Sequence, residues 1–119
     1  MSSRSREDSV TDTRPTISTH VLDTGSGRPA ADVPVRLWQG DGVGGFAIVA
    51  EARTDADGRI HDLLDGAPLS AGLYRLEFGL DGGGFFTGLS VDLRIEDTSR
   101  SYHVPLLRAP FGLSTYRGS

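Results

Sequence analysis

The sequence predicts an all-β protein, an antiparallel β-sandwich, from two observations. About seven or eight short segments alternate apolar and polar residues with the period of a strand, and turn residues separate them. Sustained helical periodicity is absent, and the 16 glycines agree with a chain of many tight turns. Residues 62–72 are interrupted by Gly66 and Pro68, so we expect at most one short helix.

The first half of the chain predicts three strands. Residues 17–22 alternate, with His20 on the face opposite the apolar side chains. Residues 33–38 alternate as well, and Pro34 predicts that this strand starts there or lies at a sheet edge. A glycine-rich link then leads to a third strand at residues 46–50.

The middle of the chain predicts a tight turn and two further strands. Residues 54–59 are rich in turn formers, and Gly58 supplies a positive φ just before Arg59. Residues 73–78 then alternate as a strand. Residues 89–96 give the clearest half-buried strand of the chain, because apolar and polar side chains alternate over all eight positions.

The last part of the chain predicts a strand at residues 101–107 and another at 114–116. On the first of these, His103 points away from the apolar face. Apolar residues continue almost to the C-terminus, where chains usually fray. We therefore expect the end of the chain to be tied into a sheet, where it delivers polar groups to a defined place.

The length and composition fit one soluble domain. At 119 residues the chain can bury one modest core. We predict a disordered N-terminal tail over residues 1–15 and one folded domain over residues 16–119. The tail lacks the apolar segment of a secretion signal and no run reaches the length of a membrane span, so we expect a cytoplasmic protein with no membrane partner.

The charge balance and the lack of cysteine limit the kinds of molecule that this chain is expected to bind. With 16 acidic and 12 basic residues the net charge is −4, which argues against nucleic acid as a partner. The absence of cysteine excludes disulfides, thiolate nucleophiles and thiolate metal ligands. A small anionic ligand still fits this chain where arginine and histidine side chains gather locally.

Two histidines and an arginine form the candidate site. His20 and His103 lie on non-core faces, so one imidazole could take a proton from water while Arg59 holds a developing anion. The alternatives are that these are solvated surface residues, or that His20, His61 and His103 bind zinc. No carboxylate ligand motif accompanies the histidines, so we predict no metal and no cofactor.

Four short segments carry a resemblance to a known family. They are Ser18-Thr19-His20-Val21-Leu22-Asp23, Asp57-Gly58-Arg59, Tyr102-His103-Val104-Pro105-Leu106-Leu107 and the terminal Tyr116-Arg117-Gly118-Ser119. In this order they resemble the 5-hydroxyisourate hydrolase family, the transthyretin-like enzymes of purine breakdown. The resemblance covers about residues 16–119 and rests on the combination, since each motif alone is weak.

The resemblance implies a fold, an assembly and a reaction. The fold is a transthyretin-like β-sandwich of two four-stranded sheets. The assembly is a homotetramer with active sites at the dimer–dimer interface. The reaction is hydrolysis of 5-hydroxyisourate, a small-molecule substrate, to 2-oxo-4-hydroxy-4-carboxy-5-ureidoimidazoline in urate degradation, by histidine-assisted attack of water on a ring carbonyl. The alternative is a transthyretin-like binding module that holds a small ligand without turnover.

The resemblance also implies roles for individual residues. The implied catalytic residues are His20, Arg59, His103 and Ser119. The implied substrate-binding residues are His20, Arg59, Tyr116, Arg117 and Gly118. The chain departs from the family at Ser101, where a second histidine is usual, at Thr87, where proline is usual, and in a shortened connection at residues 79–84.

Overall fold

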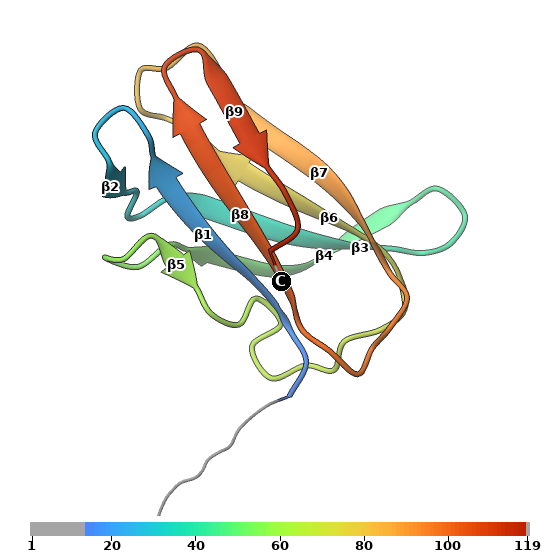
Figure 1. Cartoon of the computed structure of the whole chain (residues 1–119). Helices are drawn as coiled ribbons and strands as arrows, with labels where there is room; N and C mark the ends of the chain where they lie inside the picture. The colour runs from blue at the N-terminus through green and yellow to red at the C-terminus, as the bar shows by residue number, and fades with distance from the viewer. Residues whose placement is uncertain (1–13, 119) are drawn as a thin grey trace, which may run out of the picture.

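The computed structural model describes residues 14–118 and contains nine strands in that range (Figure 1). Residues 1–13 of the predicted tail and Ser119 lie outside the described residues. The strands are β1 (Ile17–Asp23), β2 (Arg28–Pro29), β3 (Pro34–Gly40), β4 (Phe46–Arg53), β5 (Arg59–Ile60), β6 (Gly72–Gly79), β7 (Gly88–Ile95), β8 (Tyr102–Ala109) and β9 (Gly112–Thr115).

The strands form two layered sheets, so the predicted all-β sandwich is confirmed. One sheet has the order β2-β1-β8-β9, with β5 also paired to β1, and the other has the order β4-β3-β6-β7. Figure 1 shows the first sheet in front of the second. The first sheet has five strands where four were predicted, because two separate two-residue strands, β2 and β5, both pair with β1. No helix occurs within residues 14–118: residues 63–66 form a turn, and the chain from there to the start of β6 is irregular.

One strand pair departs from the antiparallel expectation. Strands β1 and β8 run parallel and in register from Ile17 opposite Tyr102 to Asp23 opposite Arg108. Parallel neighbours cannot be joined by a hairpin. Here the chain builds the whole second sheet between them.

The core lies between the two sheets. The alternation predicted for β1, β3 and β8 is confirmed, because the apolar faces of these strands are buried and their other faces are more exposed, except at Pro105 on β8, which is buried. The fully buried side chains include Ile17, Val21, Leu37, Leu76 and Leu106. Burial of each such side chain contributes about 1.5–3 kcal/mol to the free energy of unfolding. The polar side chains of His20 and His103 lie on the opposite, outer face of the first sheet.

The predicted turn before Arg59 is confirmed and is held against β1. Gly58 has φ 77°, and a Cβ at this position would lie 2.5 Å from the carbonyl oxygen of Val21. The carbonyl of Gly58 accepts a hydrogen bond from the Val21 amide at 2.8 Å. The Asp55 carboxylate accepts hydrogen bonds from the Asp57 and Arg59 amides, both at 2.9 Å. Arg59 is therefore fixed beside the middle of β1.

Thr54, which leads into this turn, supports two backbone segments from a buried position. Its hydroxyl donates to the Ala30 carbonyl at 2.7 Å and accepts from the Val33 amide at 2.9 Å. Thr54→Val keeps the shape and leaves both groups unsatisfied, so we expect a loss of about 2–4 kcal/mol in the free energy of unfolding. Urea denaturation measures this. The exposed Thr98→Val is the control, and equal stability of the two variants would contradict the assignment.

Candidate functional site

His20, Arg59 and His103 share the outer face of the first sheet. Arg59 on β5 is the register partner of His20, and Ser18 on β1 is the register partner of His103. Side chains two residues apart on a strand point the same way, so Ser18 and His20 project to one face. The structure thus brings together three residues predicted from separate parts of the sequence.

Ser18 joins this cluster through a hydrogen bond. Its hydroxyl oxygen lies 2.9 Å from Nδ1 of His103. This contact fixes the orientation of the half-buried imidazole and leaves Nε2 as the ring nitrogen available to a ligand. Sequence reasoning did not assign Ser18 to the site. Its position two residues before His20 was the available signal, but without the β1–β8 pairing it named no partner.

The environment of His103 favours the neutral imidazole. Burial is the largest cause that lowers the pKa of His103 below its ordinary value of 6.5, and the nearby charges of Arg59 and His20 lower it further. A hydrogen bond with the Ser18 backbone acts in the opposite direction. The net lowering leaves His103 unprotonated at neutral pH and able to accept a proton.

The end of the chain reaches this cluster through Gly118. The Gly118 amide donates to the His103 carbonyl at 2.7 Å, and the two residues form an antiparallel bridge. A Cβ on Gly118 would lie 2.8 Å from Cδ2 of His103. Only glycine therefore lets the backbone lie this close to the imidazole. The expectation that the C-terminal end is tied into a sheet is confirmed up to this residue.

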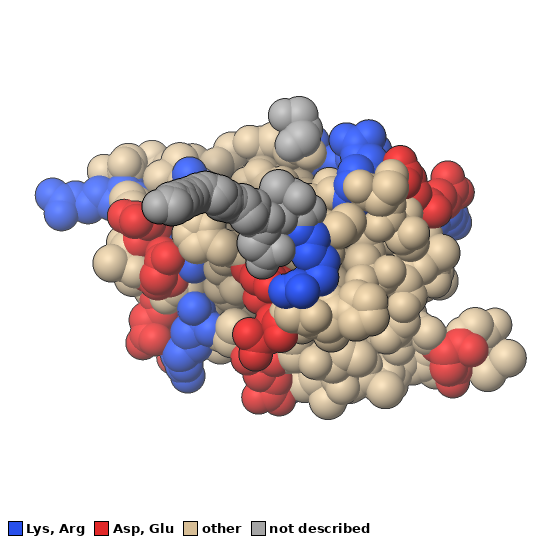
Figure 2. Space-filling model, turned by 90° about the horizontal axis from the view of Figure 1, so that it is seen from below, with Lys and Arg blue, Asp and Glu red and all other residues tan. Residues whose placement is uncertain are grey.

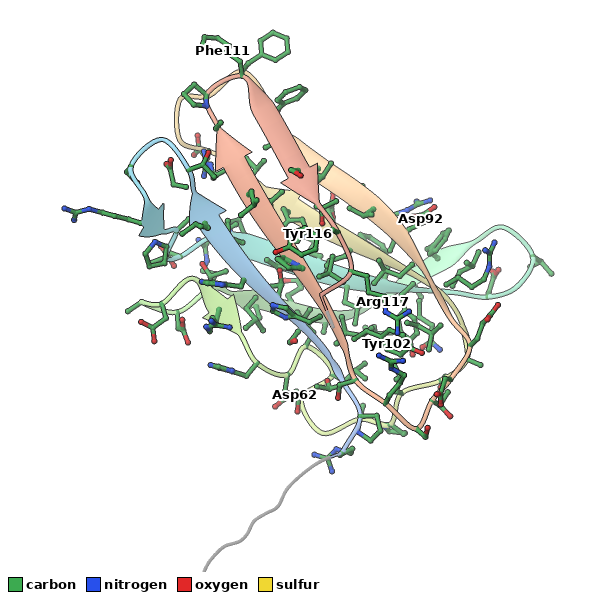
Figure 3. All side chains as sticks on the ribbon, in the orientation of Figure 1. Asp62, Asp92, Tyr102, Phe111, Tyr116 and Arg117 are labelled. Atoms are coloured by element: carbon green, nitrogen blue, oxygen red, sulfur yellow. The ribbon has the colours of Figure 1, made fainter. Side chains whose placement is uncertain are left out.

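Tyr116 and Arg117 lie elsewhere. Both line a groove of about 300 Å³ between β7 and the β8–β9 edge, whose lining includes Asp92, Leu93 and Tyr102. Figure 3 shows Arg117 next to Tyr102, on the side of β8 away from β1. Their predicted contacts with substrate stay predictions, and Ser119 lies outside the described residues.

Two other predicted features have local partners. His61 is largely exposed and lies 3.8 Å from the Asp55 carboxylate. Among residues 14–118, no group of three or more histidine, aspartate or glutamate residues is arranged to hold a metal ion. Ser101, where the family usually has histidine, accepts a hydrogen bond at 3.0 Å from the Thr16 amide. Its hydroxyl therefore holds the start of β1.

The surface has a mixed charge at the end of the sandwich shown in Figure 2. Acidic and basic side chains are interspersed there, and no extended face of one sign is visible. Within the described part of the chain, no helix is long and apolar enough to cross a membrane.

The strand order and the cluster of two imidazoles and a guanidinium define a transthyretin-like β-sandwich with a polar site on one sheet. The HIUase/Transthyretin family matches residues 17–118, and the chain belongs to this family. This confirms the resemblance seen in the four short segments.

Individual relatives agree with this family. The 5-hydroxyisourate hydrolase of Caulobacter vibrioides is 43% identical over 114 residues, which cover 87% of this chain and 97% of that protein. The structure of Klebsiella pneumoniae 5-hydroxyisourate hydrolase matches with a TM-score of 0.74 and 37% identity, covering 88% of this chain and 99% of that one. Transthyretin from Sparus aurata matches with a TM-score of 0.77 and 29% identity, over 88% of this chain and 97% of that one.

Gly118→Ala tests the contact between the C-terminal segment and His103. The added methyl group must displace the imidazole or the chain end, so we expect the His103 ring resonances to shift in NMR spectra. Gly112→Ala is the matched control, since a Cβ there meets nothing within 4 Å. Unchanged His103 resonances in the Gly118 variant would show that this contact does not exist in solution.

Arg59→Gln tests the charge coupling within the cluster. Removing the positive charge stabilises the protonated imidazole, so the pKa of His103 should rise. An NMR titration of the histidine ring protons measures the shift. Arg36→Gln, on the other sheet, makes the same charge change and should leave His103 unaffected. A His103 pKa that stays constant or falls on loss of Arg59 would contradict the arrangement.

Proposed function

We propose that this protein hydrolyses 5-hydroxyisourate, as its relatives are named for doing. The observation that carries the proposal is the gathering of His20, Arg59 and His103 on one face of the first sheet. The substrate is a planar, polar and acidic oxidised purine. Directional hydrogen bonds and positive charge suit such a ligand better than an apolar pocket does.

The residues divide the chemistry between them. His103, neutral and oriented by Ser18, takes a proton from water as the oxygen attacks a ring carbonyl. Arg59 stabilises the negative charge that develops on the carbonyl oxygen, and its planar donor fork fits an anionic ring edge. The C–N bond of the ring then breaks, and the nitrogen receives the proton from the histidine. His20 orients the substrate.

The active form is a homotetramer in this proposal, with the sites at its dimer–dimer interface. The cluster lies on the outer face of a sheet, where Arg59 is exposed and the histidines are half-buried, so a second copy can close over it. Tyr116, Gly118 and Ser119 contribute substrate contacts in the assembled oligomer. The cytoplasmic location expected from the sequence stays a prediction.

His20→Asn and His103→Asn test the catalytic assignment. Each should reduce turnover by about 10²–10⁴-fold, the usual contribution of general acid–base catalysis. The decay of freshly generated 5-hydroxyisourate, followed by absorbance, gives the rate. His61→Asn is the control because His61 is 77% exposed and contacts Asp55. A loss below tenfold in both site variants would remove these histidines from the chemistry.

The pH dependence tests the direction of the His103 shift. A general base works only when neutral, so kcat/KM should fall as pH drops through the His103 pKa. Because that pKa lies below 6.5, activity should persist to lower pH than an ordinary histidine allows. In Arg59→Gln the acidic limb should move to higher pH. An acidic limb above 6.5 in the unmodified protein would contradict the assignment.

A carrier function is the second candidate, favoured by the structural likeness to Sparus aurata transthyretin. Deleting residues 117–119 separates the two functions. A hydrolase should lose turnover when its terminal segment is removed, whereas a carrier should keep much of its affinity for the same purine. We would measure purine binding by calorimetry and the decay of 5-hydroxyisourate for the full-length protein and for the truncated variant. The two measurements together distinguish a hydrolase from a carrier.

A further inference from the structure

We propose that Arg117 is a positioning residue, which clamps the C-terminal segment to β8 so that Gly118 can support His103. Its catalytic consequence rests on the proposed function, but the clamp itself does not. The proposal assigns Arg117 a role different from the substrate contact that the family resemblance implies. The reasons lie in what Arg117 contacts and in which face of the sheet it occupies.

Arg117 lies over an aromatic ring that is itself held in place. Its guanidinium carbon is 5.1 Å from the ring centroid of Tyr102, within the range of a cation–π contact. Tyr102 is 9% exposed, and its hydroxyl donates to the Asp97 carbonyl at 2.7 Å. Within residues 14–118 Arg117 has no acidic partner, so the ring is the contact that holds its side chain.

The two sides of β8 explain why this contact matters for the site. Tyr102 and His103 are neighbours on β8 and point to opposite faces of the sheet. Arg117 contacts Tyr102 on the core side, and the next residue, Gly118, contacts His103 on the outer side. The C-terminal segment therefore holds β8 from both faces.

The contact between Gly118 and His103 is close enough that a movement of the C-terminal segment would move the imidazole. Gly118 donates to the His103 carbonyl at 2.7 Å, and its backbone packs against the imidazole. If Arg117 releases Tyr102, this hydrogen bond loses its support and the imidazole gains room to turn.

Hydrogen exchange of the Gly118 amide in the substrate-free protein tests the clamp directly. Arg117→Gln should raise the exchange rate about fivefold. Loss of a cation–π contact should increase by about this factor the population in which the Gly118 hydrogen bond is open. Arg117→Lys keeps a cation above the ring and should restore most of the protection. An exposed surface residue is altered in both variants, so folding is not at risk.

Arg100→Gln is the matched control. The guanidinium of Arg100 lies 5.8 Å from the same ring centroid, but Arg100 is not part of the C-terminal segment. Its removal makes the same charge change beside the same tyrosine and should leave Gly118 exchange unaltered. Equal acceleration in both variants, or none in Arg117→Gln, would overturn the clamp.

Kinetics separate positioning from substrate binding. A positioning role predicts that Arg117→Gln lowers kcat about three- to tenfold with KM little changed. A raised KM with unchanged Gly118 exchange would make Arg117 a substrate contact and overturn the proposal, as would faster exchange with unchanged kcat. Absence of turnover in the unmodified protein would refute the proposed function, while the exchange experiment would still decide the clamp.

Discussion

The in-register parallel pairing of β1 with β8 is the constraint on which the site depends. The two strands are about 85 residues apart in sequence, yet each residue from Ile17 to Asp23 has a fixed partner on β8. This register sends Thr19 and Val104 into the core and Ser18, His20 and His103 to the outer face. A slip of one residue on β8 would bury His103 and expose Val104. The apolar core therefore selects the register, and the register assembles the site.

Two glycines complete the arrangement, each because a backbone approaches too closely for a side chain. Gly58 packs against the Val21 carbonyl and brings Arg59 beside His20, while Gly118 packs against the imidazole of His103. Both contacts involve β1 or β8. The polar cluster is thus supported by main-chain contacts on rigid strands, which favours a preorganised site.

Local patterns in the sequence predicted the faces of the strands but not their neighbours. Alternation placed Ile17 and Val21 inside and His20 outside, and Gly58 predicted the turn before Arg59, because these features depend on adjacent residues only. The parallel partner of β1 could not be predicted from spacing, so the Ser18–His103 hydrogen bond was missed. The contact of Arg117 with Tyr102 was missed for the same reason, since it joins the chain end to a ring on another strand.

Strand alternation already suggested His20, Arg59 and His103 as a candidate site, and the resemblance to the family favoured that interpretation over solvated surface residues or a zinc site. The structure gives a physical reason for that grouping in the shared outer face and in the lowered pKa of His103. In the structure, two residues of the terminal tetrapeptide lie in different places. Gly118 contacts His103 of the polar cluster, while Arg117 lines the groove beside β7.

A crystal structure of the full chain with a non-hydrolysable oxidised purine bound tests the central claim most directly. The account predicts electron density for the purine between Arg59, His20 and His103 of one subunit, with a second copy of the chain covering it. A purine bound in the groove between β7 and β9, with the two histidines facing solvent in every subunit of the assembly, would contradict it.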